Sequence, residues 1–62
     1  MSTKLIYQLW VEYPDGSWGM VGYFTDTYWA KAAHRELEIK REVENLPKFR
    51  DMKVIEVREV WL

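Results

Sequence analysis

The chain has 62 residues, with nine basic and ten acidic side chains, one histidine and no cysteine. This length allows one domain with one small core, and the net charge of −1 offers neither the basic surface of a nucleic-acid binder nor the acidity of a DNA mimic. No disulfide can form, and no apolar stretch approaches the roughly 20 residues of a membrane helix, so we expect a cytoplasmic protein without a membrane segment.

Alternating apolar and polar residues predict a first strand at residues 4–13. The even-numbered side chains, which include Ile6 and Trp10, should face away from the core. The odd-numbered side chains should face the core: Leu5, Tyr7, Leu9, Val11 and Tyr13.

A turn at Pro14-Asp15-Gly16 and a second strand at residues 18–24 complete a hairpin. Proline fixes a turn torsion, aspartate can close a turn on its own backbone, and glycine accepts a positive φ. Gly19 and Gly22 in the second strand are expected to mark a bulge or a close approach of other atoms.

Two registers of this hairpin fit the sequence, and they differ by one residue. A three-residue loop at 14–16 pairs Tyr13 with Ser17 and turns one set of side chains to the open face: Trp18, Met20 and Phe24. A four-residue loop at 14–17 pairs Tyr13 with Trp18 and turns the alternate set outward: Val21 and Tyr23. Asp-Gly turn chemistry favours the shorter loop, and packing of Phe24 at the start of the helix favours the longer one, so both remain open.

A helix is predicted at residues 26–45, because Thr25-Asp26-Thr27 offers three N-cap residues and the next stretch lacks glycine and proline. With Thr25 as the cap, Phe24 and Trp29 would occupy the hydrophobic-staple positions, which gives Trp29 a structural role. The helix should end near Asn45, since a proline follows two residues later.

The predicted helix carries two apolar stripes with Trp29, Glu36, Lys40 and Glu44 between them. The first stripe contains Ala30, Ala33 and Leu37. The second stripe contains Tyr28, Ala32, Ile39, Val43 and Leu46. A three-stranded sheet needs to cover only one stripe, so the other is a candidate contact with a partner, unless a broad twisted sheet covers both.

A last strand is predicted at residues 52–61, with a bulge or twist where the apolar positions change parity between Val57 and Val60. The order of elements predicts an α+β fold, a single ββαβ domain over residues 1–62. Its three-stranded antiparallel sheet should have the order 2-1-3, with one helix packed on one face. The opposite face would have no covering layer, and Ile6 and Trp10 should lie there.

No residue pattern indicates catalysis, a metal site or a cofactor. His34 is expected on the polar side of the helix, without a cysteine or a second histidine to form a metal cluster or a nucleophilic pair. The glutamates of the helix alternate with Lys40 and Arg41, as on a solvated surface. The glycines lie in a hairpin rather than between a strand and a helix, so no phosphate-binding loop is predicted. We therefore expect a non-enzymatic protein.

The runs Asp15-Gly16-Ser17-Trp18 and Gly22-Tyr23-Phe24-Thr25-Asp26-Thr27, followed by Ala30 and Ala33, resemble the sheet-to-helix junction of AP2 and integrase-arm DNA-binding domains. In those domains a three-stranded sheet enters the major groove, which implies DNA binding. Here Lys4 is the one basic residue of the first two strands, which leaves few side chains to replace phosphate counterions. An AP2-like DNA-binding domain is therefore the second alternative.

A looser resemblance covers nearly the whole chain. It rests on the hairpin, on the helix pattern at Phe24, Thr25, Ala30 and Ala33, and on a closing strand with Val57, Val60 and Leu62. In these features the chain resembles small bacteriophage and prokaryotic ββαβ proteins, and in element order a small phage inhibitor of host RNA polymerase. The resemblance implies an inhibitor or modulator that occupies a surface of a host protein or defence complex in the host cytoplasm.

The aromatic content predicts where a partner would bind. The chain contains four tryptophans, four tyrosines and two phenylalanines, more bulk than one small core usually hides. Trp10 is the predicted anchor, because a rigid aromatic residue beside apolar neighbours is a common hot spot. The predicted binding residues are Trp10, Ile6, Trp18, Met20 and Trp61. The first alternative is a homodimer in which two open sheet faces or two helix stripes cover each other.

Overall fold

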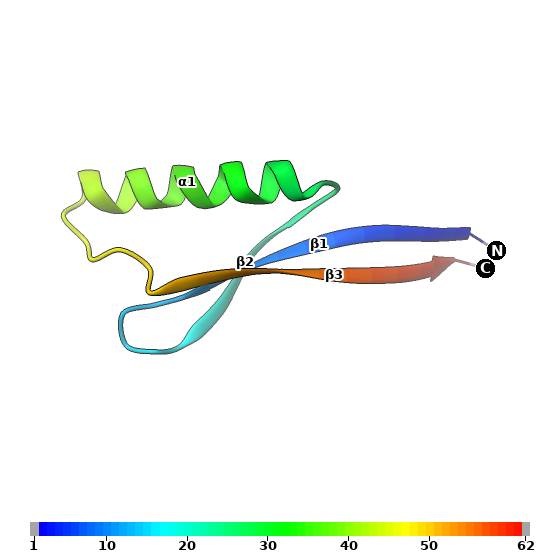
Figure 1. The fold of residues 1–62 in the computed structure, drawn as a ribbon, viewed down its shortest axis with the longest axis horizontal. Helices are drawn as coiled ribbons and strands as arrows, with labels where there is room; N and C mark the ends of the chain where they lie inside the picture. The colour runs from blue at the N-terminus through cyan, green and yellow to red at the C-terminus, as the bar shows by residue number, and fades with distance from the viewer. Residues whose placement is uncertain (1, 62) are drawn as a thin grey trace.

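The computed structural model describes residues 2–61, with side chains described for residues 3–60. The elements in chain order are β1 (Ser2–Glu12), β2 (Trp18–Phe24), α1 (Thr27–Val43) and β3 (Asp51–Trp61). They form an antiparallel sheet of order β2-β1-β3, with α1 along one face (Figure 1). The predicted α+β fold and sheet order are confirmed, and each element begins and ends within two residues of its predicted bounds.

The turn between β1 and β2 has the hydrogen bonds of a three-residue loop. The Tyr13 N–H donates to the Ser17 carbonyl oxygen at 2.8 Å, and the Gly16 N–H donates to the Tyr13 carbonyl oxygen at 2.9 Å. Gly16 adopts a φ of 90°, which favours glycine. The Ser17 hydroxyl and the Ser17 N–H both donate to Asp15 Oδ1. These two hydrogen bonds, the first more than the second, lower the pKa of the Asp15 carboxyl.

A bulge in β2 combines the two predicted registers in one strand. Near the turn, Trp10 pairs with Met20, as the shorter loop predicts. On the other side of the bulge Leu9 pairs with Gly22, as the longer loop predicts. Val21 is therefore the extra residue of the bulge.

The bulge determines which β2 side chains share a face. Residues that pair across a sheet point to the same side, so Trp18 and Met20 lie with Trp10 on the face opposite α1. Tyr23, which pairs with Gln8, lies on that face as well. Phe24 pairs with Tyr7 and faces α1 instead. The register favoured by the Asp-Gly turn holds on the turn side of Val21. The register favoured by the packing of Phe24 holds on the side toward α1.

The two glycines of β2 are covered by aromatic rings of the protein itself. A Cβ atom added to Gly19 would lie 2.9 Å from Cε2 of Tyr13, and one added to Gly22 would lie 3.0 Å from Cε2 of Phe24. The predicted bulge and the predicted close approach are both found. The bulge lies between the two glycines, and an aromatic ring lies close to each of them.

The N-terminus of α1 is capped by Asp26, one of the three predicted candidates, and not by Thr25, the cap on which the staple positions depended. Asp26 has extended backbone angles, φ −149° and ψ 145°, and its Oδ1 accepts the Tyr28 N–H at 2.8 Å. A carboxylate also interacts favourably with the positive end of the helix dipole, which threonine cannot do.

The C-terminus of α1 ends in a Schellman motif centred on Asn45. Asn45 has a φ of 58°, its N–H donates to the Glu42 carbonyl oxygen, and the Leu46 N–H donates to the Arg41 carbonyl oxygen at 2.8 Å. Asparagine tolerates this left-handed conformation better than most residues. The predicted end of the helix near Asn45 is confirmed.

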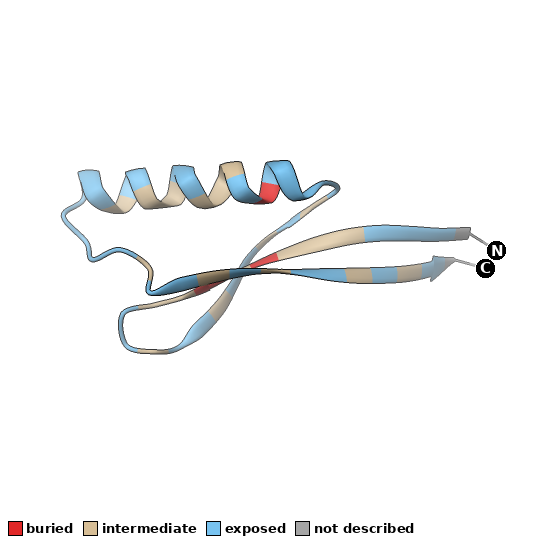
Figure 2. Ribbon diagram, in the orientation of Figure 1, coloured by how far each residue is buried: buried red, intermediate tan, exposed pale blue. Residues whose placement is uncertain are grey.

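The core is very small. Among the side chains of residues 3–60, those fully buried are Leu9 and Val11 of β1 and Ala30 of α1 (Figure 2). The prediction that the odd-numbered face of β1 forms the core is therefore confirmed at Leu9 and Val11. It fails toward the start of the strand, where Leu5 is 40% exposed.

The side of α1 that was predicted to be polar packs against the connection to β3. The Arg41 guanidinium carbon lies 4.6 Å from the ring centroid of Phe49, and Glu38 Oε1 accepts the Phe49 N–H at 2.9 Å. The Phe49 ring also contacts His34 at 6.1 Å and Tyr13 at 5.5 Å between centroids. These contacts draw one flank of α1 toward the loop and leave the opposite flank uncovered.

β3 pairs with β1 over its whole length, from Asp51 opposite Glu12 to Trp61 opposite Ser2. Of the predicted bulge or twist in this strand, the bulge is absent, because the register does not shift at any pair. The apolar residues change faces within this regular register. Val54 faces α1, whereas Ile55 and Val57 pair with Gln8 and Ile6, which lie on the uncovered face.

Residues 2–6 and 57–61 form a two-stranded ribbon that projects beyond β2 and α1 (Figure 1). The molecule is accordingly flat and long, with extents of 47 × 21 × 12 Å. Its radius of gyration is 13.6 Å, whereas a compact chain of this length would have about 10.6 Å. A large fraction of the side chains thus lies at the surface.

Candidate interaction surfaces

The face of the sheet opposite α1 carries an apolar belt with Trp10 at its centre. Trp10 pairs with Met20 of β2 on one side and with Lys53 of β3 on the other. We call this surface the open face, because none of the elements described over residues 2–61 covers it. Its central residues are Ile6, Gln8, Trp10, Trp18, Met20, Tyr23, Lys53, Ile55 and Val57, and the strand partners Lys4 with Glu59 and Glu12 with Asp51 lie toward its two ends.

Trp10 is held in place by its neighbours and is only half-exposed. Its Nε1 donates to Gln8 Oε1 at 2.9 Å, and Lys53 Nζ lies 6.0 Å from its ring centroid. The same ammonium lies 4.5 Å from the ring centroid of Trp18, within cation–π range. Strand alternation predicted the face correctly but could not predict this partial cover, which comes from side chains beside the ring.

The structure brings together four of the five predicted binding residues. Ile6 and Trp10 of β1 share the open face with Trp18 and Met20 of β2, which are 38% and 36% exposed. Trp61 belongs to the end of β3, but its side chain lies outside the described residues. β3 adds Ile55 and Val57 to this surface, and these two were missed because no register was predicted for the last strand.

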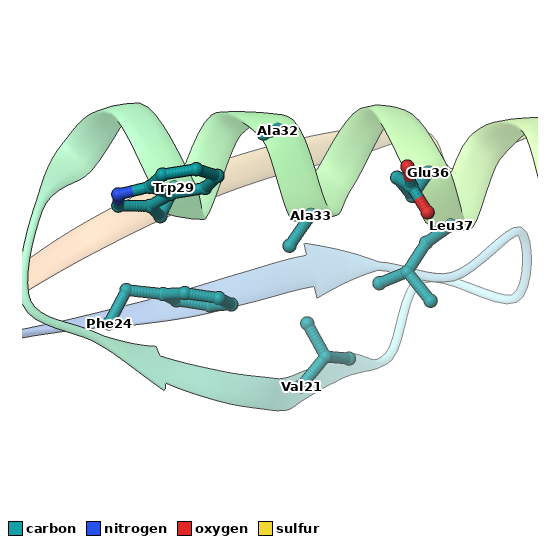
Figure 3. Close-up of a pocket in the computed structure, with 7 residues that line it drawn as sticks. All are labelled: Val21, Phe24, Trp29, Ala32, Ala33, Glu36 and Leu37. Carbon is teal, nitrogen blue, oxygen red and sulfur yellow. The ribbon is translucent and has the colours of Figure 1, made fainter.

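A second apolar surface is a groove between α1 and β2, with a volume of about 580 Å³ (Figure 3). Phe24 and Trp29 face each other at one end, and Val21 and Leu37 lie toward the other (Figure 3). The remaining lining residues are Ala32, Ala33 and Glu36. The expected proximity of Phe24 and Trp29 is thus found, although the cap is Asp26.

Trp29 does not have the structural role that was predicted for it, because 60% of its surface is exposed. No sequence pattern indicated the groove directly. The closest signal was the pair of glycines in β2, since the bulge between them turns Val21 toward α1.

The outer side of α1 forms the third apolar surface. The sheet covers one of the two predicted stripes, and the covered stripe is the first, in which Ala30 is fully buried. The second stays exposed, with Tyr28, Ile39, Val43 and Leu46 each more than two-fifths accessible. The alternative in which a broad sheet covers both stripes is therefore wrong. Tyr28 and Trp29 contact each other edge to face, with ring centroids 5.1 Å apart.

Metal-binding side chains do not cluster among the described residues. No cluster of three or more histidine, aspartate or glutamate side chains among them could hold a metal ion. His34 packs beside the ring of Phe49. None of the helical residues described forms a segment long and apolar enough to cross a membrane.

Comparison with known proteins gives no relative, since no family model, no curated protein and no solved structure matches this chain.

Proposed function

We propose that this chain is a non-enzymatic protein-binding module that binds another protein through its open face. The observation that carries the proposal is the belt in which Trp10 lies between Met20 of β2 and Lys53 of β3, on a side of the sheet that no described element covers. Contiguous apolar surface of this kind is costly in water, and it usually marks an interaction site.

The belt has the features of a preorganised hot spot. The hydrogen bond to Gln8 and the nearby Lys53 ammonium restrict the Trp10 ring before any partner arrives, so binding would cost less side-chain entropy. Rigid aromatic anchors beside smaller apolar side chains contribute a large share of the energy of many interfaces.

The size of the molecule suits a standard interface. Its broad side measures 47 × 21 Å, and a standard interface uses about 800 Å² on each partner. A module of this shape would act by occupying a surface of its partner, which fits inhibition or modulation of a host protein or a defence factor. The lack of cysteine favours the cytoplasm as the compartment of this interaction.

Affinity capture with the wild type and with Trp10→Ala tests the proposal. Removing a hot-spot tryptophan costs at least about 2 kcal/mol of binding free energy, so a titration should give the variant a Kd roughly 30-fold higher than that of the wild type. Tyr28→Ala is the matched control, because Tyr28 is an exposed aromatic residue on the helix and not on the open face.

Both variants should first show wild-type amide spectra away from the mutated site. If Trp10→Ala captures the same proteins as the wild type with the same affinity, the open face is not the binding surface.

A further inference from the structure

The outer flank of α1 has a seam of residues at the spacing of a helix-pairing motif. Trp29, Ala32, Glu36, Ile39 and Val43 follow one another at steps of three and four residues, so they lie along one side of the helix. We call these five residues the outer seam. Trp29, Ile39 and Val43 are 60%, 54% and 77% exposed, more than Trp18 or Met20 on the open face.

We propose that the outer seam pairs with the outer seam of a second copy, antiparallel, to form a homodimer with two open faces. The seam lies on the side of α1 away from its buried residue Ala30, so pairing there leaves the opposite face of each sheet accessible. The dimer would present two copies of Trp10.

The small core is the first reason for choosing a second copy as the partner. Three fully buried side chains among residues 3–60 are few for a chain that has no cysteine and no metal-binding cluster among its described residues. The groove between α1 and β2 adjoins the seam and shares Trp29, Ala32 and Glu36 with it. A helix laid on the seam would therefore also cover the groove and extend the apolar contact from α1 onto β2.

The charges that flank the seam are the second reason, and they select the antiparallel orientation. Arg35 and Glu42 lie on one flank, and Lys40 lies on the other. In a parallel pair opposite flanks meet, so Arg35 would face Lys40 of the second copy, and Glu36 would meet its own equivalent. In an antiparallel pair like flanks meet, and Arg35 faces Glu42 of the second copy, twice by symmetry.

The same orientation gives complementary shapes in the seam. With the two-fold axis between Glu36 and Ile39, each Val43 lies opposite Ala32 of the second copy, a larger side chain against a smaller one. Trp29 then extends to the end of the second helix, where Leu46 is exposed.

Sedimentation equilibrium of the full chain is the first test. The wild type should sediment as a dimer of 7.6 kDa chains at micromolar concentration, and Val43→Asp should weaken the dimer at least roughly tenfold. Val60→Asp is the matched control, because Val60 is another exposed valine but lies on β3, far from the seam. Trp10→Ala should remain dimeric.

Charge exchange tests the orientation. Arg35→Glu and Glu42→Arg should each weaken the dimer, because each creates two like-charge pairs, and the double variant should restore it. In a parallel dimer residues 35 and 42 do not face each other, so the double variant would not recover.

Cysteine cross-linking gives an independent result, since the chain has no cysteine of its own. Ala32→Cys and Val43→Cys, oxidised separately, should stay uncross-linked. In the antiparallel dimer position 32 lies opposite position 43 of the second copy, so the two copies of either cysteine are about 16 Å apart along the helix axis, whereas a disulfide needs Cα atoms within about 7 Å. An equal mixture of the two variants should form a mixed disulfide.

Three outcomes would overturn the inference: a wild type that stays monomeric, a dimer that both Val43→Asp and Trp10→Ala leave intact, or a cross-link in Ala32→Cys alone. A dimer that dissociates with Trp10→Ala but not with Val43→Asp would show that the open faces pair with each other. That last result would also remove the proposed function, whereas the first three would leave it standing.

Discussion

At the scale of single residues, the ring of Tyr13 is fixed on several sides. Phe49 contacts it edge to face, the Arg41 guanidinium carbon lies 5.9 Å from its centroid, and Gly19 lies beneath it. We predict that Gly19→Ala destabilises the fold by about 1 kcal/mol, because the ring cannot move away from the new methyl group without disturbing Phe49. Urea denaturation measures the change.

The Tyr13→Leu background is the control for this prediction. Without the aromatic ring, alanine at position 19 should cost less, since alanine also reduces the conformational freedom of the unfolded chain. If Gly19→Ala destabilises both backgrounds equally, the Tyr13 ring is not what excludes a side chain at position 19.

At the scale of the elements, α1 depends on Asp26 for its N-terminal cap. We predict that Asp26→Ala lowers the free energy of unfolding by about 1 kcal/mol, because the Tyr28 N–H loses its acceptor. Thr25→Ala is the matched control and should change stability much less. Thermal unfolding followed by circular dichroism compares the two variants, and a larger loss in Thr25→Ala would contradict the assignment of the cap.

Some features of the helix and the strands could be predicted from the sequence, and others could not. Alternation in β1, the turn residues and the helix stop at Asn45 act locally, so the sequence contains their causes, and the predicted bounds hold. The rotation of α1 depends instead on Phe49, which contacts the helix from a loop that carries no periodic pattern. The outer flank of α1 lies on the side of the helix away from that contact, and Trp29 is 60% exposed.

The candidate surfaces divide in the same way. The open face follows from alternation along β1, and four of its predicted residues are brought together. The groove could not be predicted, because it requires the two hairpin registers to coexist, and each register on its own would give a regular strand.

At the scale of the whole molecule, the projecting ribbon and the centre of the sheet should differ in local stability. Residues 7–12 of β1 have β2 on one side and β3 on the other, whereas residues 2–6 pair with β3 alone. We predict that amide hydrogen exchange is slowest at Leu9 and Val11 and is fast at alternate positions of residues 2–6, where the N–H points to the unpaired edge.

Exchange measured by NMR separates these amides one by one. Uniform protection along β1 would mean that the edge of the ribbon is covered in solution. Comparing the wild type with Val43→Asp shows whether that cover depends on the outer seam.

The bulge at Val21 is, in terms of topology, a one-residue insertion. A chain without Val21 would keep the turn register on one side and every pair from Leu9 with Gly22 to Tyr7 with Phe24 on the other, because the partners merely close up around the missing residue. Val21 is therefore dispensable to the sheet, and its side chain serves the groove beside α1. The scaffold and one of its surfaces can thus vary independently, since a deletion at one position would remodel the groove and leave the open face intact.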